Sequence, residues 1–277
     1  MVQPEGKLAR LKDLCAGDGQ RLDLLEAALT LSVLRRTEGV DLAPFRQHVA
    51  SMASDLSDLV RRRGASPEAL AEVIARSYGY RGDTESYDDL QNADLVRVIE
   101  RRKGLPVALS ILYLDVARRQ GWQAEGLAFP AHFLIRIGID GARHVVDPFH
   151  DGTVRDAADL RGLLRQVLGP EAELSPQHFD PVSDRDVLLR LENNVRLRLA
   201  NREDWSMAAQ SLDRMLAIAP DRPELLFEAG QLNARLDKRR AAIAAFERFL
   251  HVDGPAGDPA VRERVSGLLQ ELRRGLN

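Results

Sequence analysis

A chain of 277 residues that is 44% hydrophobic and 29% charged can bury a sizeable core, as one large domain or as two to three small ones. Its formal net charge of −3 gives no electrostatic reason to expect a nucleic-acid partner, and its one cysteine, Cys15, excludes an internal disulfide and a cysteine-based metal site. The first twenty residues lack an apolar signal core and the longest apolar run, Val107 to Ala117, is too short for a bilayer, so we expect a cytoplasmic protein without membrane contact.

Residues 1–77 are predicted to be helical, because apolar side chains recur there at intervals of three and four. A first stripe precedes Gly39, which we expect to end its helix, and comprises Leu25, Ala28, Leu29 and Ser32. A second stripe ends at Gly64 and comprises Phe45, Val49, Met52, Leu56 and Leu59. Ser66 followed by Pro67 is typical of a helix start, with the serine as N-cap and the proline in the first turn.

The central segment, residues 78–180, opens with a polar loop, after which Asn92 is expected to cap a short helix through Arg102. Pro106 is placed to begin the next helix, whose apolar residues cover nearly all of its sides, as is typical of a buried central helix. A strand is expected over 124–129. The Asp140-Gly141 dipeptide then predicts a hairpin of strands 132–139 and 142–149. The remainder, 153–180, is interpreted as a mixed connection.

The hairpin brings two polar residues together. If Ile139 pairs with Ala142, then His132 and Asp147 lie on the same face as diagonal neighbours, roughly 7–8 Å apart at the backbone. The opposite face carries the expected core residues Phe133, Ile135, Ile137 and Ile139. A histidine beside a carboxylate is either the base and orienting group of a catalytic site or a structural pair that ties two strands together.

Residues 181–277 contain a repeat with a period of 34 residues. Its matching pairs are Ala208 with Ala242, Leu212 with Phe246, Met215 with Phe249 and, one residue out of register, Pro220 with Pro255. Gly230 stands where a small residue is needed between packed helices, and this pattern is typical of tetratricopeptide repeats. Two repeats and a closing helix from Pro259 to Leu276 fit the segment. Since two repeats rarely stand alone, we expect them to dock on the preceding domain.

Three central stretches resemble the bacterial SirB-type family: Glu100-Arg-Arg-Lys-Gly-Leu-Pro-Val-Ala-Leu-Ser110, Gly126-Leu-Ala-Phe-Pro-Ala-His-Phe-Leu134 and Asp147-Pro-Phe-His-Asp-Gly152. The resemblance extends from about residue 20 to the end. It implies an α+β fold with a helical N-terminal region (1–77), a papain-type, transglutaminase-like core with a small antiparallel sheet (78–180), and a tetratricopeptide array (181–277).

The resemblance also implies a site. Transglutaminase-like enzymes place a nucleophilic cysteine at the start of the central helix and take a histidine and an aspartate from the strands that follow. His132 and Asp147 match the last two, whereas Pro106 takes the place of the cysteine. We therefore interpret the pair as a remnant and the chain as a non-catalytic protein without cofactor or metal, which binds a protein or peptide partner through its repeats.

An enzyme is the alternative: a hydrolase or acyltransferase that uses His132, Asp147 and an unconventional nucleophile. Ser110, one helical turn beyond Pro106, or an activated water is the candidate. A weaker third hypothesis is a small-ligand sensor that uses the remnant cleft. Cys15 lies on a short helical stripe outside the core, and we interpret it as a buried thiol.

Three further features bear on ligands. His144 is expected on the opposite face from His132 and His150 in a loop, which argues against a three-histidine metal site. The backbone amides of Gly104 to Val107, which follow three basic residues, are a candidate anion site at a helix start. The basic turn from Arg235 to Arg240 is either a solvated surface or a docking surface for an acidic peptide.

Overall fold

The computed structural model describes residues 4–17, 21–36, 39–130, 132–252 and 258–274. The N-terminal region is helical, as predicted. Its helices are α1 (Pro4–Leu14), α2 (Leu24–Leu34), α3 (Ala43–Arg63) and α4 (Pro67–Ala71), the last continued by a π-helical turn (Glu72–Ser77). Gly64 ends α3 and the Ser66 side chain caps α4, both as predicted, while α2 ends before Gly39 is reached. Within these described residues no helix is long and apolar enough to cross a membrane.

The central part holds a five-stranded antiparallel sheet with the order β6-β5-β4-β3-β7, and a two-stranded parallel pair, β1-β2. Its elements are β1 (Arg81–Gly82), a 3-10 turn (Leu90–Ala93), α5 (Leu95–Arg101), β2 (Lys103–Gly104), α6 (Pro106–Arg119), β3 (Gln123–Leu127), β4 (Ile135–Ile139), β5 (Ala142–Asp147), a 3-10 turn (Pro148–His150), β6 (Thr153–Arg155), α7 (Ala157–Leu168), a 3-10 turn (Pro176–Phe179) and β7 (Pro181–Val182). Helices around this small sheet confirm the α+β class.

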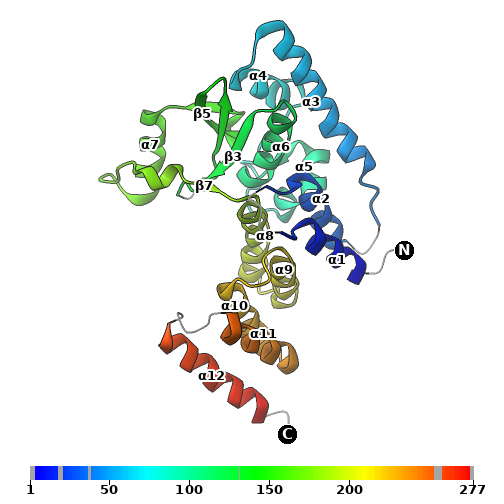
Figure 1. Cartoon of the computed structure of the whole chain (residues 1–277), viewed down its shortest axis with the longest axis vertical. Helices are drawn as coiled ribbons and strands as arrows, with labels where there is room; N and C mark the ends of the chain where they lie inside the picture. The colour runs from blue at the N-terminus through cyan, green and yellow to red at the C-terminus, as the bar shows by residue number, and fades with distance from the viewer. Residues whose placement is uncertain (1–3, 18–20, 37–38, 131, 253–257, 275–277) are drawn as a thin grey trace.

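The hairpin register is as predicted, with Ile139 opposite Ala142 and Ile135 opposite Val146. Because side chains alternate along β4, Ile135 and its neighbours at every second position join α6 in the main core. Leu134 points to the other face and packs with Leu160 of α7. The sheet therefore lies between two helices, α6 and α7, which Figure 1 shows on either side of the strands.

Two local predictions were wrong. The cap of α5 is Asp94, whose carboxylate accepts a hydrogen bond from the Arg97 N–H, and not Asn92, which belongs to the preceding 3-10 turn. The stretch interpreted as a mixed connection contains the twelve-residue helix α7, which begins at a capping box formed by Asp156 and Asp159. Strand β7 also lies beyond the proposed domain boundary at Asp180, although it pairs with β3 of the sheet.

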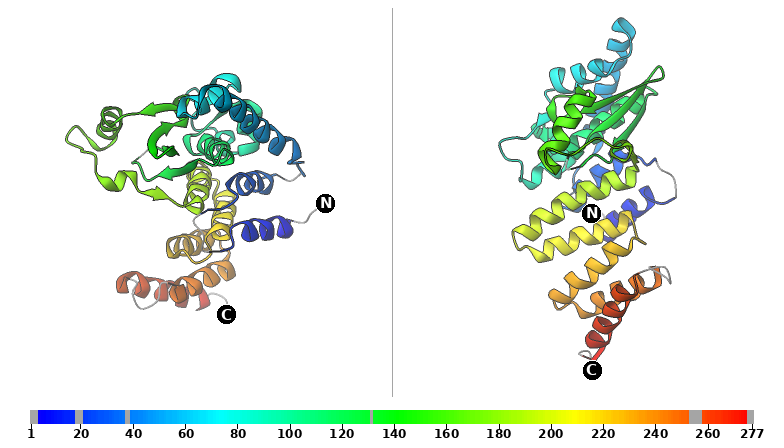
Figure 2. Two further views of the ribbon diagram at one scale, coloured as in Figure 1. Left: turned by 45° about the horizontal axis from the view of Figure 1, so that its top comes forward. Right: turned by 90° about the vertical axis from the view of Figure 1, so that its left-hand side faces the viewer.

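The C-terminal part is an array of helical hairpins. Its helices are α8 (Asp184–Asn201), α9 (Trp205–Ile218), α10 (Pro223–Arg235), α11 (Arg239–Val252) and α12 (Pro259–Arg274). Gly230 is required where α10 meets α11, because a Cβ there would lie 2.3 Å from Cε1 of Phe246. Pro255 lies outside the described residues. Figure 2 shows the array continuing away from the sheet in one stack that ends at α12.

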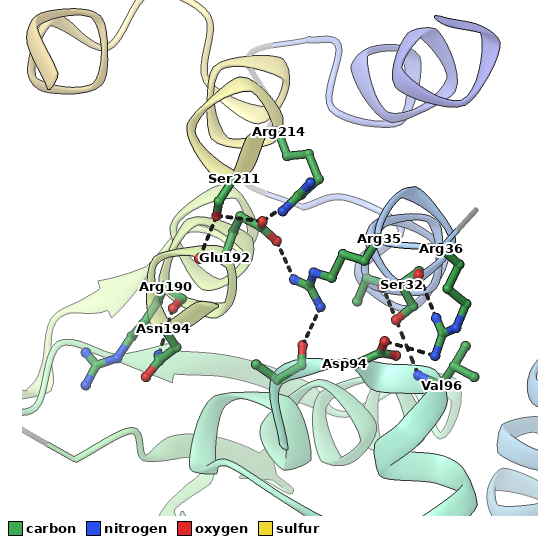
Figure 3. Close-up of polar contacts among 12 residues, drawn as sticks. Ser32, Arg35, Arg36, Asp94, Val96, Arg190, Glu192, Asn194, Ser211 and Arg214 are labelled. Atoms are coloured by element: carbon green, nitrogen blue, oxygen red, sulfur yellow. Dashed lines mark hydrogen bonds and ion pairs between the residues drawn. The ribbon is translucent and has the colours of Figure 1, made fainter. Parts of the chain in front are cut away.

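The array docks on the preceding part of the chain, as predicted. Helix α8 packs against α2, α6 and β3, and α1 packs against α9. At the start of α8, the Asp184 carboxylate accepts hydrogen bonds from the Arg118 guanidinium of α6 at 2.7 and 2.9 Å. Further along α8, the buried Glu192 carboxylate pairs with Arg35, the C-cap residue of α2, and with Arg214 of α9 (Figure 3). Charged groups thus tie three parts of the chain together.

Candidate functional site

The carboxylate of Asp147, the last residue of β5, is the centre of the candidate site and is completely buried. Its Oδ1 lies 2.9 Å from His132 Nε2 and also accepts the backbone N–H groups of Phe149 at 3.2 Å and His150 at 3.3 Å. The two backbone bonds make Asp147 the cap of the 3-10 turn that follows it. The structure therefore brings His132 and Asp147 together as predicted, although His132 lies in the loop before β4 and not in the strand itself.

The second carboxylate oxygen binds two residues that sequence reasoning missed. Asp147 Oδ2 lies 2.8 Å from His150 Nδ1 and accepts from Arg155 Nη2 at 2.9 Å and Nε at 3.2 Å. Part of the signal for His150 was available, because an aspartate before a proline is a typical helix cap whose carboxylate accepts the backbone N–H of the third residue after it. Arg155 lies on β6, whose pairing with β5 sets Thr153 opposite Asp147 and Arg155 diagonal to it.

The environment of Asp147 stabilises its ionised form. Burial by itself raises the pKa of this carboxyl group, but the hydrogen bonds from His132 and Arg155 and the charges of both histidines outweigh burial and hold the pKa well below its ordinary value. The carboxylate is thus negative and fully hydrogen-bonded within its own part of the chain. Such a group orients the imidazoles on either side of it.

One aromatic ring, that of Phe149, packs against both histidines. The Phe149 ring meets the rings of His132 and His150 edge-on, with centroids 6.4 and 5.3 Å away, and Tyr87 packs edge-on against Phe149 at 5.8 Å. The side chain of His132 is 17% exposed and that of His150 49%, so that water reaches both imidazoles but not the carboxylate. The site therefore presents two partly exposed imidazoles beside a buried carboxylate.

The structure does not bring the candidate nucleophiles to this pair. Pro106 is buried in the first turn of α6, and Ser110 is buried one turn later, with its Oγ donating to the Pro106 carbonyl at 2.7 Å. A serine hydroxyl that donates to the carbonyl one turn earlier has a structural role within its own helix. Among the described residues, the hydrogen bond of the His132 ring is with Asp147. Cys15 is buried beside α1, where burial raises the pKa of its thiol.

His132, Asp147 and His150 also form a group in which one possible metal-ligand atom from each lies within 4.8 Å of the others. Both imidazoles point at the carboxylate, but the Arg155 guanidinium occupies the same oxygen as His150 and places a positive charge where a dication would sit. These donors do not fit a metal ion well. His144 lies outside the group, opposite Ile137 in the hairpin.

The predicted anion site at the start of α6 is not available in this structure. Residues 104–107 are buried, and the Leu105 N–H already donates to the carbonyl of Asn92 at 2.9 Å. The three basic residues before this helix all have partners of their own: Arg101 with Asp83, Arg102 with Tyr80, and Lys103 with Glu85.

Replacing Gly152 by alanine is expected to lower the free energy of unfolding by about 2–4 kcal/mol. Gly152 has a φ of +71°, and a Cβ there would lie 2.7 Å from Tyr113 Oη and 2.8 Å from the Ala71 Cβ. Backbone strain and steric overlap with these two residues therefore both destabilise the alanine variant. Urea unfolding followed by far-ultraviolet circular dichroism measures the loss. The control is Gly121→Ala, which has a φ of +78° and no atom within 4 Å and should cost about 1–2 kcal/mol. Equal losses in the two variants would show that the packing of Tyr113 does not constrain the turn.

A model of the transglutaminase-like superfamily matches residues 43–193, and a tetratricopeptide-repeat model matches residues 195–270. A UPF0162 protein of Xylella fastidiosa (strain Temecula1) is 33% identical over 248 residues, which cover 87% of each chain. A UPF0162 protein of Vibrio cholerae is 29% identical over 90% of this chain and 92% of its own. Protein SirB1 of Salmonella typhimurium is 25% identical over 66% of this chain and 69% of its own. The chain therefore belongs to the transglutaminase-like superfamily and to its UPF0162 proteins, which confirms the SirB-type resemblance of its central motifs.

Proposed function

We propose that this protein is a non-catalytic member of the transglutaminase-like superfamily that acts as an interaction module, with the tetratricopeptide array as its partner-binding part. Pro106 carries the proposal. It occupies the position that the family resemblance assigns to the nucleophilic cysteine, is buried in the first turn of α6, and has no group that can attack a carbonyl. The hydroxyl nearest along the helix, that of Ser110, is committed to a backbone carbonyl.

In this proposal the His132–Asp147 pair has a structural role. The Asp147 carboxylate joins the loop before β4, the turn after β5 and the strand β6 through His132, His150 and Arg155. The same imidazole and carboxylate would orient and deprotonate a water in a hydrolase, and the partial exposure of His132 keeps that alternative testable.

A groove supports the interaction role. It has a volume of about 1790 Å³ and lies where α1, the exposed side of α8 and the turn from α9 to α10 meet, next to Phe133 of the loop before β4 and Val182 of β7. Stacked helical repeats commonly present such surfaces to extended or helical segments of other proteins. The groove combines apolar residues such as Leu189 and Leu225 with charged side chains, which suits a peptide better than a small apolar ligand.

The test of catalysis compares the full chain with its His132→Ala variant, using fluorogenic amide substrates and the incorporation of a fluorescent amine into glutamine-containing protein. We expect equal rates for both, because the site lacks a nucleophile. His144→Ala is the matched control, since it removes a partly exposed histidine of the same hairpin outside the group. A wild-type rate at least tenfold above that of His132→Ala, with His144→Ala unaffected, would establish the enzyme instead.

A further inference from the structure

Among the described residues, the Arg190 guanidinium of α8 lacks the hydrogen bonds and ion pairs that other arginines of this helix make. Among the described residues its guanidinium makes no hydrogen bond or ion pair, and it packs over the face of Phe133, with 5.1 Å from Cζ to the ring centroid. By contrast, other arginines of this helix are engaged, with Arg185 bonded to backbone carbonyls and Arg196 paired with Glu228. In Figure 3 the Arg190 side chain leaves α8 in a different direction from that of Glu192.

We propose that the groove between the core and the array binds an acidic, partly apolar segment of a partner protein, and that Arg190 binds one of its side-chain carboxylates. This inference rests on the proposed interaction function and names the chemistry of the partner. The groove is lined by Arg190, Phe133 and Asn193, so a peptide segment bound in it lies next to the Arg190 guanidinium. A guanidinium offers two parallel N–H donors to one carboxylate, which makes such a pair both strong and directional.

The burial of Arg190 gives this pairing its driving force. A partly buried cation without a counter-charge is unfavourable, and burial lowers the pKa of Arg190 from its ordinary value while only Tyr87 acts in the opposite direction. A carboxylate from a partner protein would supply the negative counter-charge that Arg190 lacks within this chain. Phe133 and Leu189 also line the groove, and apolar side chains beside such a pair lower the local polarity and strengthen it.

The other charges of the groove favour an acidic partner near α1 and α8. Lys12 has no ion pair among the described residues, and Arg185 donates to carbonyl oxygens instead of a carboxylate. The remaining lining cations are neutralised, as Arg222 pairs with Asp186 at 2.7 Å and Arg248 with Asp221 at 3.7 Å. The unpaired lining carboxylates Asp213 and Glu224 come from α9 and α10. One side of the groove is thus positive, and we expect the acidic residues of the partner there.

The exposed Leu197 adds an apolar contact to the same helix face. Its side chain is 45% exposed, one of the few large apolar side chains that the described surface leaves open. Leu189, Arg190, Asn193 and Leu197 recur at helical spacing along the groove side of α8. An amphipathic helix with glutamates beside leucines matches this sequence of apolar and cationic groups.

The test measures fluorescence anisotropy of a labelled amphipathic peptide of Glu, Leu and Ala, blocked at both ends, with the full chain. Two matched probes carry Gln or Lys at every Glu position. We expect the acidic peptide to bind at least tenfold more tightly than the Gln peptide, and Arg190→Gln to lower its affinity by about tenfold or more. Arg190→Lys keeps the positive charge without the planar guanidinium, and its affinity for the acidic peptide should lie between those of the wild type and Arg190→Gln.

The control is Arg240→Gln. Arg240 is an exposed arginine at the start of α11, next to the basic turn between α10 and α11, and lies outside the groove. Unchanged binding by Arg190→Gln, or loss with Arg240→Gln alone, would overturn the assignment to Arg190. Equal binding of the Gln peptide, or binding only of a version with a free C-terminal carboxylate, would also overturn it. If only the Lys peptide binds, the acidic partner is wrong and the interaction function stands; if no probe binds, the result counts against both. Thermal unfolding verifies that each variant is folded.

Discussion

Replacing Glu192 by alanine is expected to lower the free energy of unfolding by about 3–5 kcal/mol. The carboxylate is fully buried and takes ion pairs from Arg35 and Arg214 and a hydrogen bond from Ser211 at 2.7 Å. Burial alone raises the pKa of Glu192, but the two guanidinium charges outweigh it and lower the pKa, so the group is ionised in the native state. Its removal would leave two buried cations without a counter-charge.

The Glu192 experiment has a matched control and two built-in reporters. Glu228→Ala removes an ion pair with Arg196 whose carboxylate is partly exposed, and should cost at most about 1 kcal/mol. The two tryptophans report on different parts, since Trp122 precedes β3 of the sheet and Trp205 begins α9 of the array. In urea the Glu192→Ala variant should lose Trp205 fluorescence before that of Trp122. Equal losses for Glu192→Ala and Glu228→Ala would show that the buried cluster does not hold the array.

The cluster explains how so short an array is stable here. Repeats of this kind bury their faces against neighbouring repeats, and two hairpins leave a face uncovered. In this chain α1 and α2 cover the first hairpin, with α2 against α8 and α1 against α9. Arg35, the C-cap residue of α2, binds Glu192 of α8, which lies 157 residues further along the sequence. The N-terminal helices therefore act as the missing neighbour of the array (Figure 3).

The features that the sequence predicted correctly are those set by near neighbours. The Asp140-Gly141 turn and alternation along 135–139 fix the hairpin register, and Gly64 ends α3 where it was expected. The repeat likewise predicts a small residue between packed helices at Gly230, and the structure packs Phe246 against that glycine. Each of these patterns lies within one element or between adjacent ones.

What the sequence did not predict depends on partners far along the chain or on competing signals. Asn92 and Asp94 are both good helix caps, and the choice between them depended on which residues begin the helix. The pairing of β6 with β5, which brings Arg155 to Asp147, has no local signature in a three-residue strand. The domain limits at residues 77 and 180 remain predictions, and the pairing of β7 with β3 favours a second limit after Val182.

Asp147 is the second position at which a single change is expected to have a large effect. Asp147→Ala would leave His132, His150 and Arg155 without their shared acceptor and should lower the free energy of unfolding by about 3–5 kcal/mol at neutral pH. The control is Asp140→Asn, which changes an exposed carboxylate at the tip of the same hairpin and should cost no more than about 0.5 kcal/mol.

The pH dependence of this effect has a defined sign. Because the folded pKa of Asp147 lies below the value of about 3.9 in an unfolded chain, its contribution is complete well above pH 4 and is lost as the pH falls toward the folded value. An Asp147→Asn variant lacks this titration. The stability difference between the wild type and this variant, measured by urea unfolding at several pH values from 5 to 3, should therefore narrow as the pH falls. A constant difference down to pH 3 would contradict the assigned shift.

The same measurement separates the two roles of the His132–Asp147 pair. Groups retained for catalysis or ligand binding are commonly held at a cost to stability, so that replacing them leaves stability unchanged or raises it. A structural pair behaves in the opposite way, because its removal leaves buried donors unsatisfied. We expect His132→Ala to lose about 1–3 kcal/mol, in the same direction as Asp147→Ala, since the Asp147 oxygen that it binds is completely buried. A gain in stability for His132→Ala would instead show a site kept for function, and the search for a substrate would then take precedence over the search for a partner.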